Sequence, residues 1–437
     1  MKRKITEKLI RWKNKKAKKP LILYGARQVG KTYAIKEFGK HYFDDVIYVN
    51  FETNARLAKD FDDDISPAFL LNRLELFFGR TITPENTLIF FDEVQACERA
   101  LTSLKYFCEE APEYHVIAAG SLLGVAVNRE KYSFPVGKVE MLHLYPMDFE
   151  EYLWALRKEL LAEKIRTCFH ENTPMDRLLH ETAMELYRAY LIMGGMPGVL
   201  AAYLEKERMI DAGDIQNTIL NAYVADMSKY ITAQETAKAI ACFNSIPAQL
   251  AKDNRKFQYK VIQKGGKASL FGAALDWLHA AGIITICDKV TQGFLPPEIY
   301  KDLSSFKIYM SDVGLLTQKS MIVPHDVLTG NAHRFIGALT ENYVANALVA
   351  NGYSIYYWTS GSQAEVDFVV QDYDRVLPIE VKSDLHVKSR SLSVYVSKYK
   401  PELAIRVSGK NFGFENGMKS VPLYAAFCIE PRKPKER

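Results

Sequence analysis

LILYGARQVGKT, at residues 21–32, is the stretch that decides the fold of this chain. Four mostly apolar residues, typical of a buried strand, lead directly into GARQVGKT, which fits the phosphate-binding loop pattern GxxxxGK[ST] at every fixed position. Gly25 and Gly30 have no Cβ, so backbone N–H groups of the loop can turn inward and approach phosphate oxygens closely. We expect Lys31 to place positive charge at the β- and γ-phosphates and the Thr32 hydroxyl to bind Mg²⁺. The predicted nucleotide-binding residues are Gly25, Ala26, Arg27, Gln28, Val29, Gly30, Lys31 and Thr32.

The composition is that of an ordinary soluble globular protein, with 48% hydrophobic and 25% charged residues among 437. A chain of this length is expected to form about three domains. We expect no membrane segment and no secretory signal, because no apolar run approaches the ~20 residues that span a bilayer. Six cysteines without CxxC spacing are typical of reduced thiols, so we expect a cytoplasmic protein.

The net charge of +5 is concentrated at the N-terminus. The first nineteen residues contain ten Lys or Arg and one acid, Glu7, a net charge of +9, which leaves −4 for the remaining chain. Two interpretations stay open. This segment is either an arm that binds phosphates or a basic helix that docks on the neighbouring domain through Leu9, Ile10 and Trp12.

An apolar strand that ends in two acids, TLIFFDE at residues 87–93, completes the expected nucleotide site. A carboxylate at the mouth of a buried parallel strand beside a phosphate loop is suited to bind Mg²⁺, and we assign this role to Asp92 together with Thr32. Glu93 is then placed to orient and deprotonate the attacking water. Further strands are expected at residues 45–52, 114–121 and 139–144. Their alternation with helices predicts an α/β fold with a mostly parallel sheet and helices on both faces.

Four segments together resemble a large family of prokaryotic AAA+ ATPases whose physiological role is poorly defined: GARQVGKT, FFDEVQ, YPMDFEEYL and GGMPGVL. The resemblance covers nearly the whole chain and implies ATP and Mg²⁺ as cofactors and assembly into a homo-oligomer. It implies that Ser121 senses the γ-phosphate, although Ser121 can equally cap the helix that follows it. It also implies an arginine supplied by a neighbouring subunit, for which we nominate Arg129.

We expect four parts along the chain. They are a P-loop AAA+ ATPase core at residues 1–146, a helical lid at 147–206, a winged-helix-like region at 207–325 and a restriction-endonuclease-like mixed-sheet domain at 326–437. Within the lid, MGGMPG at residues 193–198 is expected to be a helix break too flexible to belong to a core. In the winged-helix-like region, DNA binding and a structural spacer stay open as alternatives, because few basic residues surround the expected recognition helix.

The C-terminal part combines three acids and a lysine in a suggestive pattern. On the expected helix at residues 332–350, Glu341 falls on an apolar side and requires a partner. The expected strand at 365–370 carries Asp367. On the expected strand at 376–382, the two-residue period puts Glu380 and Lys382 on one face. Further strands are expected at residues 403–407 and 421–427.

This pattern is similar to the PD-(D/E)xK nuclease core. The resemblance implies that Asp367 and Glu380, helped by Glu341, hold Mg²⁺ while Lys382 orients water for phosphodiester attack. The proline that names the motif does not precede Asp367, and Pro378 lies on the ExK strand instead. Reuse of the fold without cleavage therefore stays open.

Two functions of different classes follow. The first is an ATP-driven enzyme acting on DNA or RNA, with Glu93, Asp367, Glu380 and Lys382 as catalytic residues. The second is a nucleotide-dependent switch or scaffold whose nuclease-like domain does not cleave. ATP turnover with an unbroken nucleic acid would favour the second.

Overall fold

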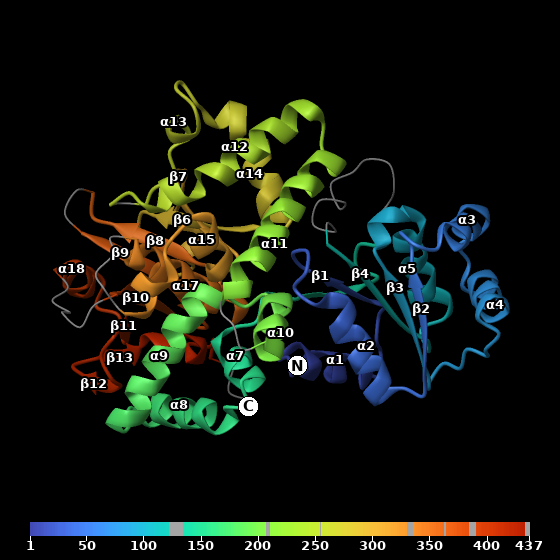
Figure 1. Ribbon diagram of the computed structural model, residues 1–437, viewed down its shortest axis with the longest axis horizontal. Helices are drawn as coiled ribbons and strands as arrows, with labels where there is room; N and C mark the ends of the chain where they lie inside the picture. The colour runs from blue at the N-terminus through green and yellow to red at the C-terminus, as the bar shows by residue number, and fades with distance from the viewer. Residues whose placement is uncertain are drawn as a thin grey trace. The chain divides into compact units, whose positions relative to one another are not determined.

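The computed structural model describes residues 1–121, 134–206, 210–253, 255–329, 335–361, 364–383 and 390–432. The chain divides into two compact units. The N-terminal unit is Lys2–Tyr145 with Ala280–Gly282, and the C-terminal unit is Pro146–His279 with Ile283–Arg437 and Met1. Figure 1 labels their helices and strands.

The N-terminal unit is built on a parallel sheet. Its strands are β1 (Leu21–Tyr24), β2 (Asp45–Asn50), β3 (Thr87–Asp92), β4 (His115–Gly120) and β5 (Glu140–His143). They pair in the order β2-β3-β4-β1-β5, and the four pairings are parallel. The helices are α1 (Ile5–Lys13), α2 (Lys31–Tyr42), α3 (Ala55–Asp63), α4 (Pro67–Phe78) and α5 (Glu98–Glu110), with a 3₁₀ turn η1 (Val94–Ala96). The predicted parallel α/β architecture is confirmed.

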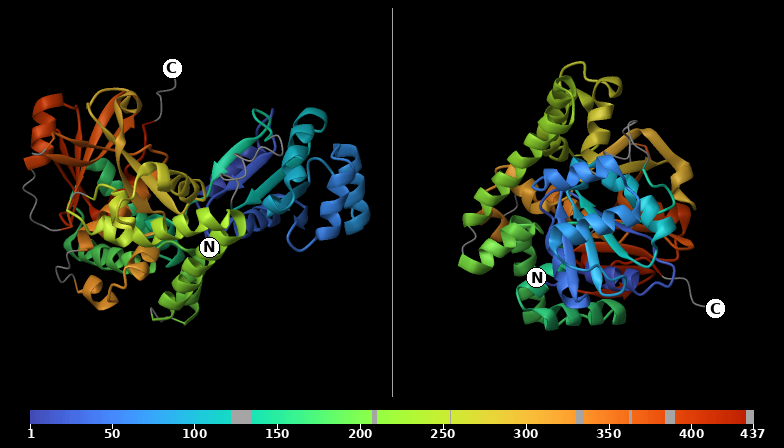
Figure 2. Two further views of the ribbon diagram at one scale, coloured as in Figure 1. Left: turned by 90° about the horizontal axis from the view of Figure 1, so that it is seen from above. Right: turned by 90° about the vertical axis from the view of Figure 1, so that its right-hand side faces the viewer.

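Helices cover both faces of this sheet. Ile89 of β3 and Val116 of β4 share an apolar core with Leu104 of α5. Successive side chains of a strand point to opposite faces, so the fully buried Leu88 and Phe90 point to the other face. Helix α2 packs on the strands from that side (Figure 1, Figure 2). Because both faces of the sheet are apolar, these strands appear in the sequence as continuous hydrophobic runs.

The basic N-terminal segment is a docked helix. Ile5, Leu9 and Trp12 of α1 are each at most 5% exposed, while Ile10 is only half-buried. The indole N–H of Trp12 donates to the carbonyl oxygen of Lys19 at 2.8 Å. Of the two interpretations left open by the charge pattern, the structure supports docking.

The C-terminal unit contains a mixed sheet. Its strands are β6 (Ile284–Val290), β7 (Lys301–Met310), β8 (Tyr356–Thr359), β9 (Glu365–Asp372), β10 (Arg375–Val381), β11 (Ala404–Ser408), β12 (Gly413–Glu415) and β13 (Met418–Pro422). They pair in the order β12-β13-β11-β10-β9-β8-β6-β7. Helices from residue 146 onward are α7 (Phe149–Ala155), α8 (Glu159–Glu171), α9 (Arg177–Met193), α10 (Pro197–Lys206), α11 (Ile210–Tyr230), α12 (Ala233–Leu250), α13 (Tyr259–Ile262), α14 (Ala268–Ala280), α15 (Val313–Lys319), α16 (Pro324–Leu328), α17 (Ile336–Ala350) and α18 (Arg390–Tyr399), with 3₁₀ segments η2 (Pro297–Tyr300) and η3 (Leu423–Cys428).

This sheet crosses the boundary expected between residues 325 and 326. Strand β6 pairs with β7 on one side and with β8 on the other, so the pair expected as a wing is built into the C-terminal sheet. The region 207–325 is therefore not a separate winged-helix module. A hairpin looks the same in sequence whether it stands alone or extends a larger sheet, because the local period does not reveal the third strand.

The helices expected as a lid also belong to the C-terminal unit. Asn411 accepts from the backbone N–H of Met175 at 2.9 Å and donates back to its carbonyl at 2.8 Å. The Lys419 ammonium donates to the carbonyl of Phe169, on α8, at 2.6 Å. The range 147–206 is thus joined to strands more than 200 residues later in the chain.

Two expected element ends differ from the structure. The strand expected at residues 421–427 is β13 up to Pro422, followed by the 3₁₀ segment η3, whose side chains are all buried. The apolar residues at 421–427 favour burial whether they form a strand or a 3₁₀ helix. Over so few residues, periodicity cannot distinguish these two conformations. Helix α17 begins at Ile336, whereas residues 330–334 are outside the described part of the chain.

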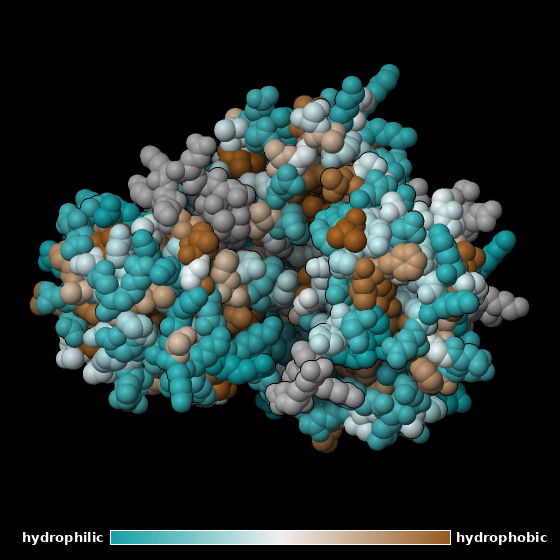
Figure 3. All heavy atoms as spheres, turned by 180° about the vertical axis from the view of Figure 1, so that it is seen from behind, coloured by the Kyte–Doolittle hydropathy of each residue, from teal (hydrophilic) through white to brown (hydrophobic). Residues whose placement is uncertain are grey.

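Large hydrophobic side chains are exposed at several positions, among them Leu76, Leu160 and Leu303. On the face drawn in Figure 3 they form small patches separated by hydrophilic residues. Among the described residues, none of the helices is both long enough and apolar enough to cross a membrane.

Residues 193–196 of the glycine break are buried in the core, which corrects the expectation of a flexible segment. The N–H of Gly195 donates to the buried Asp312 carboxylate at 2.6 Å, and its carbonyl accepts from the N–H of Met147 at 2.7 Å. A Cβ at Gly195 would collide with the Met147 carbonyl oxygen. The close approach of two backbones, rather than flexibility, accounts for this glycine.

Replacing Gly195 by Ala is expected to lower the free energy of unfolding of the C-terminal unit by about 3 kcal/mol, because the two backbones must separate. Gly198→Ala is the matched control, since a Cβ there meets nothing within 4 Å and alanine favours the helix. Urea unfolding followed by tryptophan fluorescence measures both. Equal midpoints for the two variants would contradict the packing argument.

Candidate functional site

The phosphate loop joins β1 to α2 in the N-terminal unit. Gly25 has φ +148° and Gly30 has φ +92°, values that L side chains rarely adopt. A Cβ at Gly25 would also collide with the carbonyl oxygen of Leu144, at the end of β5. Gln28 also has positive φ, at 65°, which is strain typical of a ligand-binding loop. Positive φ therefore explains both glycines that the motif requires, and close packing is a second reason at Gly25.

Lys31 already lies inside this loop. Its side chain is buried, and its ammonium donates to the carbonyl oxygens of Gly25 at 2.9 Å and Ala26 at 2.8 Å. Helix α2 begins at Lys31, so the positive end of the helix dipole is located at the loop. Backbone amides, helix dipole and ammonium together form a site for the phosphates of a nucleotide.

Thr32 and Asp92 meet as expected. The Thr32 hydroxyl donates to Asp92 Oδ2 at 2.8 Å, and the Tyr48 hydroxyl donates to the same oxygen at 3.0 Å. Hydroxyl and carboxylate oxygens are ligands that Mg²⁺ accepts, usually one or two from the protein with the rest from water and phosphates. The donor set therefore fits this ion.

Tyr48 is a site residue that sequence reasoning missed. It lies on β2, whose Asn50 is in register with Asp92 of β3. The Asn50 side chain donates to the Tyr48 hydroxyl at 3.3 Å. The strand itself was predicted, and the polar pair near its end was the available signal. The proximity of Tyr48 to Asp92 follows only from the pairing of β2 with β3.

Glu93 follows β3 with φ 52°, a conformation that turns the chain sharply after Asp92. Burial raises the pKa of Glu93, and the adjacent Asp92 charge raises it further. The Gln95 side-chain amide donates to Glu93 Oε2 and acts in the opposite direction, lowering the pKa. A carboxylate with raised pKa beside the metal-binding acid is suited to accept a proton from water.

Ser121 follows β4, which lies between β3 and β1. Carboxyl ends of parallel strands share one edge of a sheet, so Ser121 lies at the same edge as the loop and Asp92. It is buried, with 8% of its surface exposed. Its role as a γ-phosphate sensor stays a prediction. Arg129 lies outside the described residues.

The raised pKa of Glu93 predicts the acid limb of ATP hydrolysis. A general base must be ionised, so kcat is expected to fall on acidification with a midpoint above 4.5, the ordinary value for Glu. Gln95→Ala removes the contact that favours the ionised form and should move this midpoint to higher pH. Steady-state rates between pH 5 and 9 measure it, and a shift to lower pH would contradict the assignment.

The C-terminal unit holds a second group of ionisable residues. Phe368 of β9 is in register with Ile379 of β10, which puts Asp367 and Glu380 at the next positions of these antiparallel strands. Asp367 Oδ2 accepts from the backbone N–H of Val381 at 2.8 Å. Lys382 Nζ lies 3.1 Å from Glu380 Oε1. The structure thus brings Asp367, Glu380 and Lys382 together as the sequence predicted.

Glu380 is nearly fully buried, with 1% of its side chain exposed. Its Oε2 is buried and has no hydrogen-bond partner among the residues that the structure describes. A buried carboxylate oxygen without a partner costs free energy, so we expect Glu380 Oε2 to bind a cation or a hydrogen-bond donor. Asp367 is half-buried and the Lys382 side chain is 38% exposed, so both are accessible to a ligand.

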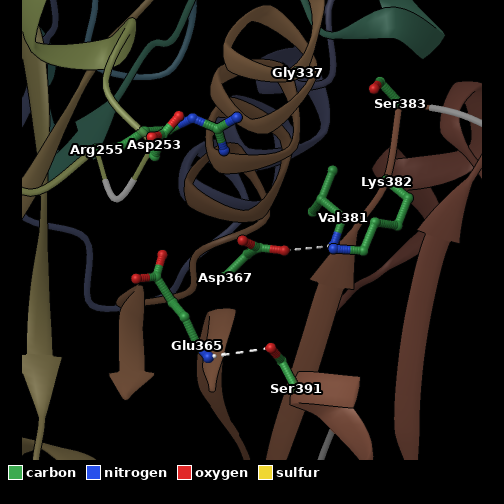
Figure 4. Close-up of a pocket in the computed structure, with 9 residues that line it drawn as sticks. All are labelled: Asp253, Arg255, Gly337, Glu365, Asp367, Val381, Lys382, Ser383 and Ser391. Atoms are coloured by element: carbon green, nitrogen blue, oxygen red, sulfur yellow. Dashed lines mark hydrogen bonds between the residues drawn. The ribbon is translucent and has the colours of Figure 1, made fainter. Parts of the chain in front are cut away.

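A cavity of about 450 Å³ opens beside this group. The cavity is lined by Glu365 and Asp367 of β9 and by Lys382, which follows β10 (Figure 4). Across from Lys382 lie Arg255 and, on α17, Gly337. Asp253 lies beside Arg255, so both carboxylates and cations line the cavity on each side. Carboxylates and cations together are the groups that a phosphate bound through a metal ion requires.

Glu341 has the partners that its apolar position required. It forms ion pairs with Arg255 and with Lys307, which is fully buried and 3.1 Å away. The Tyr309 hydroxyl also donates to it, and burial raises the pKa of Tyr309 well above its ordinary value, so this hydroxyl remains a donor. Lys307 reaches Glu365 as well, at 2.6 Å.

This network corrects the expected metal ligands. Over the described ranges, no three His, Cys, Asp or Glu side chains gather closely enough to hold a metal ion. Glu341 is neutralised by Arg255 and Lys307, so it does not join Asp367 and Glu380. Two carboxylates remain, which is a sufficient protein contribution for Mg²⁺.

The N-terminal part of the chain matches a known sequence family. Residues 17–153 match the family described as "AAA domain". This part of the chain is therefore similar to AAA domains. Residues 184–326 and 336–426 match two families that are each described as a domain of unknown function. The family matches therefore give a similarity to AAA domains for residues 17–153 and assign no activity to residues 184–326 and 336–426.

The similar proteins are distant. The uncharacterized protein MJ1544 of Methanocaldococcus jannaschii is 24% identical over 205 residues, 46% of this chain and 39% of that protein, so this chain spans about two fifths of that relative's length. The Walker-type ATPase PABY2304 of Pyrococcus abyssi is 15% identical, with 72% of this chain and 94% of that chain covered and a TM-score of 0.45. The ORC2 protein of Aeropyrum pernix, in ADPNP and ADP complexes, is 13% identical, with 74% and 93% covered and a TM-score of 0.39.

Proposed function

We propose that the AAA domain binds ATP with Mg²⁺ and hydrolyses it. The observation that carries this proposal is the contact between Thr32 and Asp92 beside the buried Lys31 ammonium. A hydroxyl and a carboxylate suited to magnesium, next to a phosphate-binding cation, form the part of a P-loop site that recognises a nucleoside triphosphate.

Each residue has a stated role in this proposal. The loop amides and Lys31 bind the β- and γ-phosphates, and Thr32 and Asp92 hold the magnesium ion, which neutralises charge on the phosphates. Glu93 orients a water molecule and takes its proton. In this proposal Ser121 senses the γ-phosphate, and Arg129 of a neighbouring copy completes the site.

The test is release of inorganic phosphate from ATP by the full chain. Hydrolysis should require Mg²⁺ and should stop when EDTA removes it. Particle size with and without MgATP tests the homo-oligomer in the same preparation. ATP consumption that is unaffected by EDTA would contradict this mechanism.

A second candidate function is metal-dependent cleavage of DNA or RNA by the C-terminal unit. It is favoured by Asp367 and Lys382, which line the open cavity, and by Glu380 beside Lys382, whose Oε2 has no hydrogen-bond partner in the described part of the chain. Asp367 and Glu380 would hold the ion, and Lys382 would orient the water that attacks the phosphodiester. Without cleavage, the same cavity would serve a nucleotide-dependent switch or scaffold.

A further inference from the structure

Arg3 is an unusual residue to find at the nucleotide site. It lies outside residues 17–153, the range that matches the AAA domain. Its side chain is nevertheless buried, with 7% exposed. Its Nη1 donates to the carbonyl oxygen of Val29, in the phosphate loop, at 2.9 Å. Its Nη2 donates to the carbonyl oxygen of Tyr145 at 2.7 Å.

The anchoring of α1 makes this contact persistent. Arg3 immediately precedes α1, which is fixed by its buried Ile5, Leu9 and Trp12. Beyond the helix, Lys15 pairs with Glu140 at 2.6 Å. A buried guanidinium held by a docked helix loses little further freedom when it binds the loop, so its hydrogen bonds are stronger than those of an exposed arginine.

The bond to Val29 sets the direction of the next amide. A trans peptide unit is planar, and its C=O and N–H groups point in opposite directions. Holding the Val29 carbonyl toward Arg3 therefore directs the Gly30 N–H to the opposite side of the loop. The φ of +92° at Gly30 then lets the chain enter α2. Inward N–H groups of this kind are what bind a phosphate.

We propose that Arg3 is a positioning residue that preorganises the phosphate loop for ATP. The guanidinium fixes the Val29–Gly30 peptide against the backbone of Tyr145, and it adds a positive charge close to the bound phosphates. This proposal rests on the proposed ATP site. It also gives the basic N-terminal segment a function that its charge pattern left open.

The test is titration of the full chain with MgATP and, separately, with AMP, which lacks the β- and γ-phosphates. Arg3→Ala should raise the Kd for ATP about tenfold, roughly the effect of one charge-assisted hydrogen bond, and leave the Kd for AMP unchanged. Arg3→Lys keeps the positive charge but cannot donate from two nitrogens at once, so its affinity for ATP should lie between those of Arg3→Ala and wild type. Arg11→Ala, at a 68% exposed side chain on α1, is the control and should match wild type.

Unfolding midpoints separate positioning from a purely structural role. Arg3→Gln and Arg3→Lys should fold like wild type while MgATP raises their midpoints less than it raises that of wild type. A wild-type Kd for ATP in all Arg3 variants, or an equal loss for ATP and AMP, overturns the inference. Failure of the wild-type chain itself to bind ATP would instead overturn the proposed function.

Discussion

Replacing Lys31 by Ala is expected to weaken MgATP binding by about 100-fold or more, whereas Glu93→Gln should bind MgATP like wild type and hydrolyse it at least about 100-fold more slowly. Lys31 contributes charge-assisted contacts to phosphate oxygens, each equivalent to about 1.5–3 kcal/mol. Glutamine keeps the shape of Glu93 but cannot take a proton, and general base catalysis contributes about 10²- to 10⁴-fold.

The two variants separate binding from chemistry. Calorimetric titration gives the Kd, and phosphate release at saturating MgATP gives kcat. Glu110→Gln, an exposed acid at the end of α5, is the control for removal of a carboxylate and should behave like wild type. Normal turnover by Glu93→Gln would show that another group activates water, while tight binding by Lys31→Ala would remove the loop lysine from the site.

The second large effect is expected in the C-terminal unit. If this unit cleaves nucleic acid, Asp367→Asn and Lys382→Ala should each lower the Mg²⁺-dependent cleavage rate at least about 100-fold, since metal and water positioning supply several kcal/mol of the barrier reduction. The substrates are labelled single- and double-stranded DNA and RNA, incubated with Mg²⁺ or Mn²⁺ and with EDTA as the metal-free control.

Asp374→Asn is the matched control. Asp374 lies in the turn between β9 and β10, its side chain is 68% exposed, and it pairs with Arg432. The Asp374→Asn variant should cleave nucleic acid at the wild-type rate. Cleavage that persists in the Asp367 and Lys382 variants would refute these residue roles. An intact substrate with wild-type protein that turns over ATP would favour the switch or scaffold alternative.

The sequence predicted the strand, the loop and the following acids of the proposed nucleotide site because their signals are local. The run from Leu21 to Tyr24, the spacing of Gly25 and Gly30, and the acids after residue 91 lie within short segments whose geometry a motif already contains. The contact of Thr32 with Asp92 followed from the rule that parallel strands end at one edge. The need for a partner at Glu341 followed from helical periodicity alone, and Lys307 and Arg255 meet it.

The corrections concern contacts between distant segments. Nothing in residues 284–310 shows that β6 pairs with β8 as well as β7, so a local hairpin suggested a separate winged helix. Gly195 looked flexible because glycine permits flexibility, whereas here its missing Cβ permits contact with Met147. Arg3 was one basic residue among ten in its segment, and only the fold distinguishes it from the exposed ones.

In the proposed site a triphosphate and a magnesium ion bind where Lys31, Thr32 and Asp92 meet. Calorimetric titration of the full wild-type chain with ATP in Mg²⁺, repeated with EDTA, tests it most directly. Saturable binding that weakens strongly when the metal is removed is the predicted result. Absence of ATP binding in Mg²⁺ by the folded chain would contradict the claim.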